Sequence, residues 1–429
     1  MSRLVVRFVT VICLWGSILN AQNLNQLSFI PSDGVAFAVK AQGNHLYFVD
    51  WRGSSSLFIS VDMSNPNQPV VEDSLLMAGF AVEFDLNGQY AYLAMADNEF
   101  GLRILDISAP AAIKEIVFIE MGEIFGTFFK DDTLYVTSGG VGAFDASQPD
   151  TLKFLWSYNS NATGDGIDVF VFEGHSYLSV DRGGLFIIDN ATHDLVGTLA
   201  APEIIEVFVV NENLLFFTDA TSGLVAVDIR DPHHPSLLDT ITGSGAFAFG
   251  VEAAGNFVYF CNGPNGLKTV DFSQPTDLNL KDTFAPEGIF AIHLALKDSL
   301  IFLASGDYDE TGNFINGIYI LKNDFVTAIR EPGPPAPQSF VLEQNHPNPF
   351  NPETLIRYSL PFGGDVRLEI YNLLGQKIRT LFNTNRPKGS YTERWNGKDD
   401  SGRSAAAGLY IYKMTFRDHL QARKMLLVR

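Results

Sequence analysis

Two carboxylate residues could do chemistry near the centre of this protein. Asp168 and Glu206 occupy the second position of a short apolar strand pattern that recurs along the chain. Two carboxylates that face one channel could hold a cation, or act as an acid/base pair, because shared negative charge raises one pKa. The alternative is two solvated acids in a water-filled channel. In the other copies a small residue stands at this position: Ala38, Ala81, Gly126, Gly250 and Ala291.

A second set of carboxylates recurs at a nearly constant interval, but its surroundings indicate a structural role. The most complete copy is Gly101-Leu-Arg-Ile-Leu-Asp-Ile-Ser-Ala-Pro110. Asp-x-Ser-x-Pro is a turn pattern in which the carboxylate accepts backbone N–H groups and Pro restricts the φ angle. A seventh copy has Lys322 in place of the aspartate. The turn aspartates, spaced 39 to 44 residues apart, are Asp62, Asp106, Asp145, Asp189, Asp228 and Asp271.

An acidic insertion in the last repeat could bind calcium. Residues 306–317 alternate oxygen-bearing side chains around Gly312, which is a spacing found in calcium-binding loops. The bidentate Glu that such a loop needs at its twelfth position is replaced by Ile318, so an exposed acidic hairpin is the alternative. Calcium is the only cofactor that the sequence suggests. Its ligands would be Asp307, Asp309, Thr311 and Asn313.

No catalytic motif is evident elsewhere in the chain. The sequence has no Gly-x-Ser-x-Gly elbow, no His-Glu-x-x-His helix and no phosphate-binding glycine loop, and its eight histidines lack metal-binding spacing. Cys261 lies in an apolar run, which predicts a buried structural thiol. These observations favour a protein without catalytic activity, although they do not exclude an enzyme.

The residues named above belong to a repeating unit of four short strands. Each turn aspartate follows an aromatic residue in an apolar run, a further apolar strand precedes that run, and a fourth follows the turn. A period of about 40 residues with four strands is typical of a β-propeller blade. Seven copies therefore predict seven blades. The aromatic residues are Tyr47, Tyr92, Tyr135, Tyr177, Phe216, Tyr259 and Phe302.

The two ends of the repeat array suggest how it closes. The seventh copy has no clear fourth strand, whereas residues 25–31, ahead of the first copy, resemble the fourth-strand runs. We expect the N-terminal segment to complete the last blade, because this pairing removes two free sheet edges. An open stack of sheets is the alternative.

The repeat resembles a known family. The pattern Gly-Leu-x-Ile-x-Asp-x-Ser-x-Pro, complete at residues 101–110 and partly matched at 57–66, 223–232 and 266–275, is similar to the LVIVD-repeat family of bacterial surface propellers. The resemblance covers about residues 24–325. It implies a propeller and export from the cell, and it supplies no agreed active site.

The first 21 residues have the composition of a secretory signal peptide. Arg3 and Arg7 provide a positive start, an apolar stretch follows, and Ala21 is a small residue at the expected cleavage point. An uncleaved anchor is the alternative. No later run is long and apolar enough to span a membrane, so we expect no transmembrane segment in the mature chain. Cys261 is then the only cysteine left, and no internal disulfide can form.

Charge is distributed unevenly along the chain, whose formal net charge is −20. Residues 22–330 carry 40 acidic and 13 basic side chains, whereas residues 331–429 carry 9 acidic and 14 basic ones. So acidic a main body repels nucleic-acid phosphates and anionic lipid, which argues against either as a partner. The sequence thus predicts an acidic propeller over residues 22–326 and a basic domain with a different role.

A Pro-rich linker over residues 327–339 separates the two parts. Its Glu-Pro-Gly-Pro-Pro-Ala-Pro run resists both helix and sheet pairing. Beyond it, residues 340–429 hold six short strand patterns with turn signals between them, which predicts a small immunoglobulin-like β-sandwich. The overall prediction is an all-β protein: a seven-bladed β-propeller followed by this sandwich.

The terminal domain resembles the type A C-terminal sorting domain of type IX secretion substrates. The flagellar hook-capping immunoglobulin-like domain shares its Trp-x-Gly and Gly-x-Tyr core, but not its Pro-Asn-Pro-Phe-Asn-Pro opening. The resemblance implies recognition by the type IX secretion machinery, with the tail then removed or anchored at the cell surface. An accessory sandwich is the alternative. The residues that carry the resemblance are Asn345, Pro347, Asn348, Pro349, Phe350, Asn351, Pro352, Trp395, Gly397, Gly408, Tyr410 and Lys424.

Together these features predict an exported propeller, released or held at the outer-membrane surface, that binds a protein or glycan ligand. A rigid ring offers a broad binding face, and no catalytic set of residues is evident. One alternative is a polysaccharide hydrolase or lyase with its site in the channel mouth around Asp168 and Glu206. Another is a structural component of the envelope.

Overall fold

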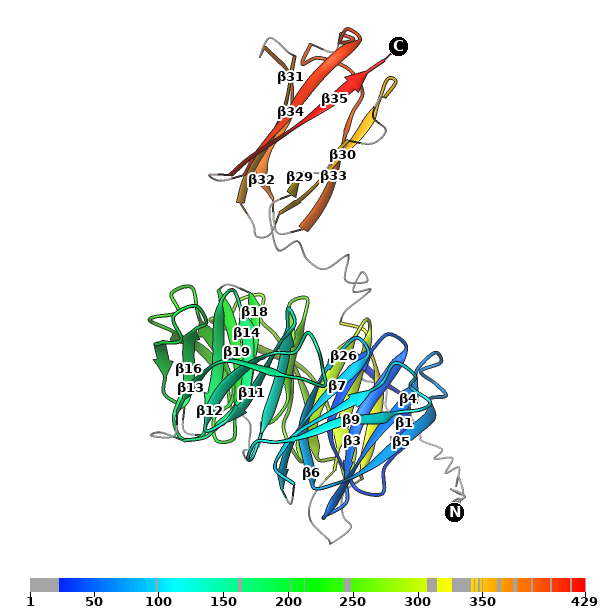
Figure 1. The fold of residues 1–429 in the computed structure, drawn as a ribbon, viewed down its shortest axis with the longest axis vertical. Coiled ribbons are helices and arrows are strands. Elements are labelled where there is room, and N and C mark those ends of the chain that lie inside the picture. Colours follow the sequence, from blue (N-terminus) through cyan, green and yellow to red (C-terminus); the bar gives the residue numbers. More distant parts are fainter. Residues whose placement is uncertain are drawn as a thin grey trace. The chain divides into compact units, whose positions relative to one another are not determined.

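The computed structural model describes residues 23–97, 99–160, 164–201, 203–211, 213–242, 248–306, 315–325, 341–342, 344–345, 348, 350–360, 364–372, 376–386, 389–401, 403–416 and 419–428. The chain divides into two compact units between Ile329 and Arg330. Every described element longer than a turn is a β-strand (Figure 1). Three of the sequence predictions lie outside the described residues: the signal peptide, the linker and the four proposed calcium ligands.

The first unit consists of seven four-stranded antiparallel sheets. Sheets 1 to 3 each take four consecutive strands. Sheet 1 is β2 (Val35–Gln42), β3 (His45–Trp51), β4 (Ser55–Asp62) and β5 (Val70–Ala78); sheet 2 is β6 (Phe80–Asn87), β7 (Tyr90–Asp97), β8 (Gly101–Asp106) and β9 (Lys114–Glu120); sheet 3 is β10 (Gly126–Lys130), β11 (Thr133–Ser138), β12 (Gly140–Asp145) and β13 (Lys153–Asn159).

Sheets 4 to 6 repeat this order, whereas sheet 7 combines the two ends of the unit. Sheet 4 is β14 (Gly166–Phe172), β15 (His175–Val180), β16 (Gly184–Asp189) and β17 (Leu195–Leu199); sheet 5 is β18 (Ile204–Asn211), β19 (Leu214–Asp219), β20 (Gly223–Asp228) and β21 (Ser236–Ile241); sheet 6 is β22 (Val251–Ala254), β23 (Phe257–Cys261), β24 (Leu267–Asp271) and β25 (Asn279–Phe284); sheet 7 is β26 (Ala291–Lys297), β27 (Leu300–Ser305), β28 (Gly317–Asn323) and β1 (Leu24–Pro31).

The burial of the strands follows from face-to-face packing of the sheets. The middle strands β3, β8 and β20 are buried on both faces, because each sheet packs between two others. Fourth strands such as β13 alternate between exposed and half-buried positions. The repeated aromatic residues Tyr47, Tyr92 and Tyr259 are fully or almost fully buried between sheets, which explains why every copy keeps a large ring there.

The N-terminal strand β1 pairs with β28, which is the last described strand of the first unit. Leu24 lies opposite Asn323 and Pro31 opposite Gly317 in this antiparallel pair. The first strands of successive sheets contact one another in chain order, and β26 of sheet 7 also contacts β2 of sheet 1. Figure 1 shows yellow strands of sheet 7 beside blue strands of sheet 1, although the two lie far apart in the sequence.

The second unit is a two-sheet sandwich. Its three-stranded sheet has the order β29 (Val341–Leu342), β30 (Thr354–Leu360) and β33 (Gly389–Trp395), and its four-stranded sheet has the order β32 (Lys377–Arg386), β31 (Gly364–Asn372), β34 (Gly408–Phe416) and β35 (His419–Leu427). The two sheets enclose an apolar core around Trp395 and Tyr412, both with no exposed side-chain surface. Strand β34 alternates buried and half-buried positions, as expected for a sheet with one face on the core.

Candidate functional site

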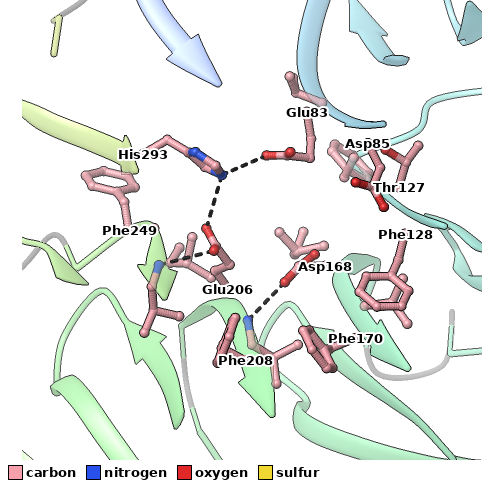
Figure 2. Close-up of a pocket in the computed structure, with 18 of the residues that line it drawn as sticks. Glu83, Asp85, Thr127, Phe128, Asp168, Phe170, Glu206, Phe208, Phe249 and His293 are labelled. Carbon is pink, nitrogen blue, oxygen red and sulfur yellow. Dashed lines mark hydrogen bonds and ion pairs between the residues drawn. The ribbon is translucent and has the colours of Figure 1, made fainter. Parts of the chain in front are cut away.

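A cavity of about 430 Å³ lies among the first strands of the seven sheets. This volume is within the range of small-molecule sites. Each of the seven sheets contributes side chains to its wall. Figure 2 shows carboxylates and His293 pointing toward the same space, with phenylalanine rings around it. Asp168 and Glu206, the two acids predicted to face the channel, both line this cavity.

The structural register identifies the equivalent channel positions, and it corrects the sequence alignment in two sheets. Asp168 lies nine residues before Tyr177, and in sheets 2 and 7 the residues nine before the repeated aromatic are Glu83 and His293. Strand pairing agrees, since Glu83 lies opposite Ala94 and His293 opposite Ala304, each two residues from the aromatic position. In sheet 5 the spacing is ten residues, and the pairing of Val207 with Phe217 identifies Glu206 as the equivalent residue. The Asp168 tier is therefore Ala38, Glu83, Gly126, Asp168, Glu206, Gly250 and His293.

The misalignment has a physical cause. The sequence comparison matched the apolar triplets around Ala81 and Ala291 to the triplet around Asp168, which placed them two residues out of register. The β-bulges show the true equivalence, because the bulge between Gly166 and Asp168 recurs between Ala81 and Glu83 and between Ala291 and His293. Ala81 and Ala291 are completely buried and do not line the cavity. Counting back from the buried aromatic residue, rather than matching apolar triplets, would have found Glu83 and His293 in the sequence.

Two of the small residues in this tier are required by close approach of neighbouring strands. A Cβ atom at Gly126 would lie 2.7 Å from the carbonyl oxygen of Ile167, and one at Gly250 would lie 2.9 Å from the Cα atom of His293. Both distances are shorter than non-bonded atoms tolerate. The glycines therefore allow adjacent sheets to meet at the channel, while the other positions can carry functional side chains.

Two further tiers flank the Asp168 tier along the strands. The residue immediately before each member is apolar and lines the cavity; this apolar tier is Phe37, Val82, Phe125, Ile167, Ile205, Phe249 and Ile292. Two residues after each member comes the Phe170 tier, whose members lie directly opposite the repeated aromatic residues. The Phe170 tier is Lys40, Asp85, Phe128, Phe170, Phe208, Glu252 and Ala295.

The Phe170 tier has one aromatic side and one charged side. Phe128, Phe170 and Phe208 come from three consecutive sheets, and their ring centroids are 4.8 Å and 5.2 Å apart in succession. Figure 2 shows these three rings in a row along one side of the cavity, away from His293 and Glu83. On the charged side, Lys40 comes from sheet 1, Asp85 from sheet 2 and Glu252 from sheet 6. The cavity is thus amphipathic.

Asp168 combines a structural hydrogen bond with an unusual proton affinity. The backbone N–H of Val207 in the next sheet donates to Asp168 Oδ2 at 2.9 Å. Burial, and then the negative charge of Glu206, raise the pKa of Asp168 to about 7. A carboxyl group with such a pKa can exchange a proton near neutral pH, as a general acid or base requires.

Glu206 repeats this arrangement one sheet further on. The backbone N–H of Val251 donates to Glu206 Oε1 at 3.1 Å, and Glu206 Oε2 lies 3.8 Å from His293 Nε2. Burial raises the pKa of Glu206, although His293 opposes the shift. The structure therefore places both predicted acids in one site, and it also gives each a role in joining two sheets.

His293 lies between two of the three carboxylates of its tier, Glu83 and Glu206. Its Nε2 atom is 3.2 Å from Glu83 Oε2, and the backbone N–H of Val39 lies 3.4 Å from Nδ1. Burial lowers the pKa of His293, but Glu83 and Glu206 outweigh it and raise the pKa to about 9. Protonation keeps the Glu83 pair and gives up the longer Val39 bond, which needs an unprotonated Nδ1.

Lys40 supplies the second positive charge at the cavity. Its ammonium group is 3.5 Å from Glu83 Oε1. Burial opposes its charge, but Glu83 and Asp85 outweigh that effect and raise the pKa of Lys40. Burial also opposes ionisation of Glu83, yet Lys40 and His293 hold the pKa of Glu83 at about 2. Among the carboxylates that line the cavity, Glu83 is therefore the one whose negative charge is balanced by two positively charged neighbours.

The remaining carboxylates, Asp85 and Glu252, are held by backbone groups. Phe129 N–H donates to Asp85 Oδ2 at 2.6 Å, and Leu296 N–H donates to Glu252 Oε2 at 2.9 Å. Burial raises the pKa of both acids, although Lys40 opposes the shift. Like Asp168 and Glu206, they join consecutive sheets and add negative charge to the cavity.

The repeated aspartates lie at turns away from the cavity. Asp106 Oδ1 accepts the backbone N–H of Ser108 at 2.8 Å, and Asp62 accepts that of Ser64 at the same distance. Asp145, Asp228 and Asp271 accept the equivalent bond. The copy without Pro differs, since Asp189 accepts N–H groups from Ala191 and Thr192. These contacts account for the repeat without any catalytic role.

Other candidate groups do not form a reactive site. Cys261 is completely buried, and burial raises the pKa of its thiol well above the usual value, which favours an inert group. Within the described residues, no cluster of three or more His, Cys, Asp or Glu side chains could hold a metal ion. The described ranges also contain no helix long and apolar enough to cross a membrane.

The motif residues of the terminal domain have structural contacts where they are described. Asn345 is buried, and its amide donates to Thr354 Oγ1 at 2.9 Å; Asn348 Oδ1 accepts the N–H of Leu426 at 2.9 Å. Phe350 packs on Trp395 with ring centroids 5.5 Å apart, and Trp395 also contacts Tyr410. Asn351, Pro352, Gly397, Gly408 and Lys424 are described as well, whereas Pro347 and Pro349 are not.

Comparison with known families supports this division of the chain. LVIVD repeats match over residues 33–76, 78–118, 208–242 and 247–285, and an FlgD Ig-like domain matches over residues 356–418. The latter is the family whose Trp-x-Gly and Gly-x-Tyr core the sequence shares. No curated protein matches the chain. The protein is therefore a propeller-type repeat protein with an Ig-like domain near its C-terminus.

Solved structures with similar folds are also propellers. The WD40 repeats of RRP9 have 10% identity and a TM-score of 0.56, over 70% of this chain and 97% of theirs. The WD40 propeller domain of Doa1 has 12% identity and a TM-score of 0.53, over 70% of this chain and 97% of that one. At such identities the likeness shows the fold alone.

A further similar structure extends over both units. PorZ, described as a surface component of the type IX secretion system of Porphyromonas gingivalis, has 12% identity and a TM-score of 0.50. The match covers 93% of this chain and 60% of PorZ. The chain thus spans less than two thirds of that protein, and the likeness again concerns the fold.

Proposed function

We propose that this protein is an exported binding module whose ligand site is the channel cavity of a closed seven-bladed propeller. The cavity itself carries this proposal: it has the volume of a small-molecule site and an amphipathic wall of side chains from all seven sheets. Seven four-stranded sheets and the β1–β28 pair support the blade number and the closure.

A binding screen tests this function. The chain without its first 21 residues would be titrated by calorimetry with small amines, neutral saccharides and peptides. We expect a ligand whose affinity falls at least about tenfold, or about 1.4 kcal/mol, in Phe208→Ala. Phe257→Ala is the matched control, because Phe257 is a half-buried aromatic residue of β23 that does not line the cavity. Equal losses in both variants would contradict a channel site.

We further propose that the terminal domain is a sorting signal for type IX secretion. The proposal is supported by the motif residues from Asn345 to Pro352 and by the basic composition of this part of the chain. The fold likeness to PorZ, itself a type IX component, is compatible with it. The protein would then act outside the cell or at the outer-membrane surface, with the tail removed or anchored there.

A second candidate function is an acid/base enzyme, for example a polysaccharide hydrolase or lyase. One observation favours it: Asp168, with its pKa near 7, lies beside a second carboxylate in the same cavity. Release of reducing ends or unsaturated products from a polysaccharide panel, abolished in Asp168→Asn and Glu206→Gln, would support the enzyme. Turnover unaffected by both substitutions would refute a role for these acids.

A further inference from the structure

The cavity carries an excess of negative charge. Its lining includes five carboxyl groups and only two basic groups, Lys40 and His293. Both basic groups lie near Glu83, at 3.5 Å and 3.2 Å. The hydrogen bonds to Asp168 and Glu252 come from backbone N–H groups, which occupy one oxygen and do not neutralise a charge. The uncompensated charge of the cavity is therefore concentrated in the carboxylates away from Glu83.

The apolar parts of the cavity specify the rest of the ligand. The apolar tier surrounds the space on one side of the Asp168 tier, and three neighbouring rings of the Phe170 tier, tilted against one another, form a wall on the other. Phenylalanine faces attract cations through their π electrons and also pack against aliphatic or aromatic groups. A ligand that satisfies the whole cavity thus has a positive end and an apolar body.

The same arrangement disfavours other ligand classes. An anion would meet the repulsion of the excess carboxylates. A metal ion would need several convergent ligands, and the described residues contain no group of three that could provide them. A primary ammonium group does not need three convergent ligands, because each of its up to three N–H donors can bind a separate carboxylate oxygen of the cavity.

We propose that the channel cavity binds a small primary ammonium compound with an apolar body, its nitrogen between Asp168 and Glu206 and its body against Phe170 and Phe208. This inference rests on the proposed channel-binding function and adds the chemical class of the ligand. The ammonium group supplies a positively charged partner for Asp168. Glu206 then interacts with both the ligand and His293.

The proposal implies a pH dependence of binding. Asp168 is surrounded by Glu206 on β18, Glu83 on β6 and Lys40 on β2, while Lys130 on the adjacent β10 donates to the carbonyl of Val171. Because the pKa of Asp168 is about 7, the ligand competes with a proton below this pH. Affinity for the ammonium compound therefore rises by up to about thirtyfold from about pH 5.5 to about pH 8, and protons are released on binding.

Calorimetry with a matched pair of probes tests the ligand class. The probes are 2-phenylethylammonium and 2-phenylethanol, which have similar shapes and differ in charge, and the protein is the full chain without its first 21 residues. At about pH 8 the ammonium is expected to bind at least about tenfold more tightly than the alcohol. Asp168→Asn, which keeps an oxygen for Val207 N–H, is expected to remove most of this preference.

Asp239→Asn is the control variant. Asp239 Oδ2 accepts the N–H of Leu278 at 2.7 Å, which is the same kind of bond to the next sheet, but the residue does not line the cavity. Its substitution is expected to leave both affinities unchanged. An equal loss of ammonium binding in Asp239→Asn and Asp168→Asn would overturn the assignment of Asp168.

The outcomes separate this inference from the function on which it rests. If the alcohol or a neutral saccharide binds as tightly as the ammonium and Phe208→Ala weakens it, the channel site stands and the cationic class is wrong. If a lysine-containing peptide binds but the free ammonium does not, the small-molecule ligand is wrong. If none of the probes binds, both the inference and the channel-binding function fail.

Discussion

Asp168 illustrates how one residue can be both a structural link and a functional group. Its Oδ2 atom accepts a hydrogen bond from the next sheet, while Glu206 and burial raise its pKa to about 7. A folded-state pKa above the ordinary value of 3.8 means that the folded protein keeps a proton that the unfolded chain has already lost. The stability of the propeller therefore falls as pH rises from about 4 to about 7 because of this group.

The substitution Asp168→Asn tests this linkage. The amide keeps an acceptor for Val207 N–H but has no charge, so we expect the variant to be more stable than the wild type above pH 7, by at most about 4 kcal/mol. Near pH 4 the two proteins should be nearly equal in stability. Thermal unfolding at several pH values would measure the difference; a stabilisation that does not vary with pH would contradict the raised pKa.

His293 has the opposite sign of linkage. Its pKa is raised to about 9 by Glu83 and Glu206 against the effect of burial, so its charge stabilises the folded state fully below about pH 6.5. This contribution is lost as pH rises through 9. The residue is also the one basic group that contacts two members of the Asp168 tier.

We expect His293→Gln to lower the unfolding free energy by about 2–4 kcal/mol near pH 6, because Glu83 and Glu206 then lose a buried partner. The wild-type loss of stability between about pH 6.5 and 9 should disappear in the variant. Denaturant unfolding across this range measures both effects. The exposed pair of His234 with Asp231 provides the control, and His234→Gln should change stability little.

At the scale of the element, β1 connects the two ends of the propeller unit. It pairs along its length with β28, and its Leu24 and Ile30 side chains are buried, at 2% and 6% exposure. Without it, the edge of β28 and the apolar surface beneath β1 would be open to water. The strand is therefore expected to stabilise sheet 7 and the closed arrangement together.

Leu24→Asp tests this role without deleting the strand. A buried carboxylate in place of leucine should lower the unfolding free energy by about 3 kcal/mol or more, seen as a lower melting temperature. Gln26→Asp, in the same strand but exposed, is the matched control and should have little effect. Deletion of residues 22–32 should be at least as destabilising as Leu24→Asp. A melting temperature unaffected by the deletion would indicate an open stack of sheets.

At the scale of the whole molecule, the chain joins an acidic propeller to a basic Ig-like domain. Asn345 N–H donates to the Tyr412 hydroxyl on β34, Asn348 accepts the N–H of Leu426 on β35, and Phe350 packs on Trp395, so the types of these residues follow from packing. The sorting role must therefore be tested by transport rather than by structure.

Truncation after Pro337 tests the sorting proposal. The truncation removes the basic C-terminal domain. In the native host, we expect the shortened chain to accumulate in the periplasm, because the signal for outer-membrane transport is missing. Fractionation with immunodetection would measure its location. A control carrying Lys413→Ala, a half-buried position of β34 outside the motif, should be exported normally. Normal export of the truncated chain would refute the sorting role.

Several features could be predicted before folding is considered: the repeat, the four strands of each unit, the turn role of residues such as Asp106, and the pairing of the N-terminal segment with the last repeat. These features depend on local patterns: apolar alternation, turn residues and an aromatic residue at a constant spacing. The spacing from the aromatic residue also contained Glu83 and His293, but a comparison of apolar triplets, which matched strands two residues out of register, missed them.

The side chains that these strands bring together depend on how the sheets pack, which local sequence patterns do not specify. Asp168, Glu206, Glu83 and His293 come from four different sheets, and their proximity depends on how the sheets pack around the channel. The pKa values near 7 for Asp168 and near 9 for His293 arise from that proximity and from burial, neither of which a linear pattern specifies. The sequence could therefore predict two acids at one site, whereas the amphipathic cavity that contains them depends on how the sheets pack together.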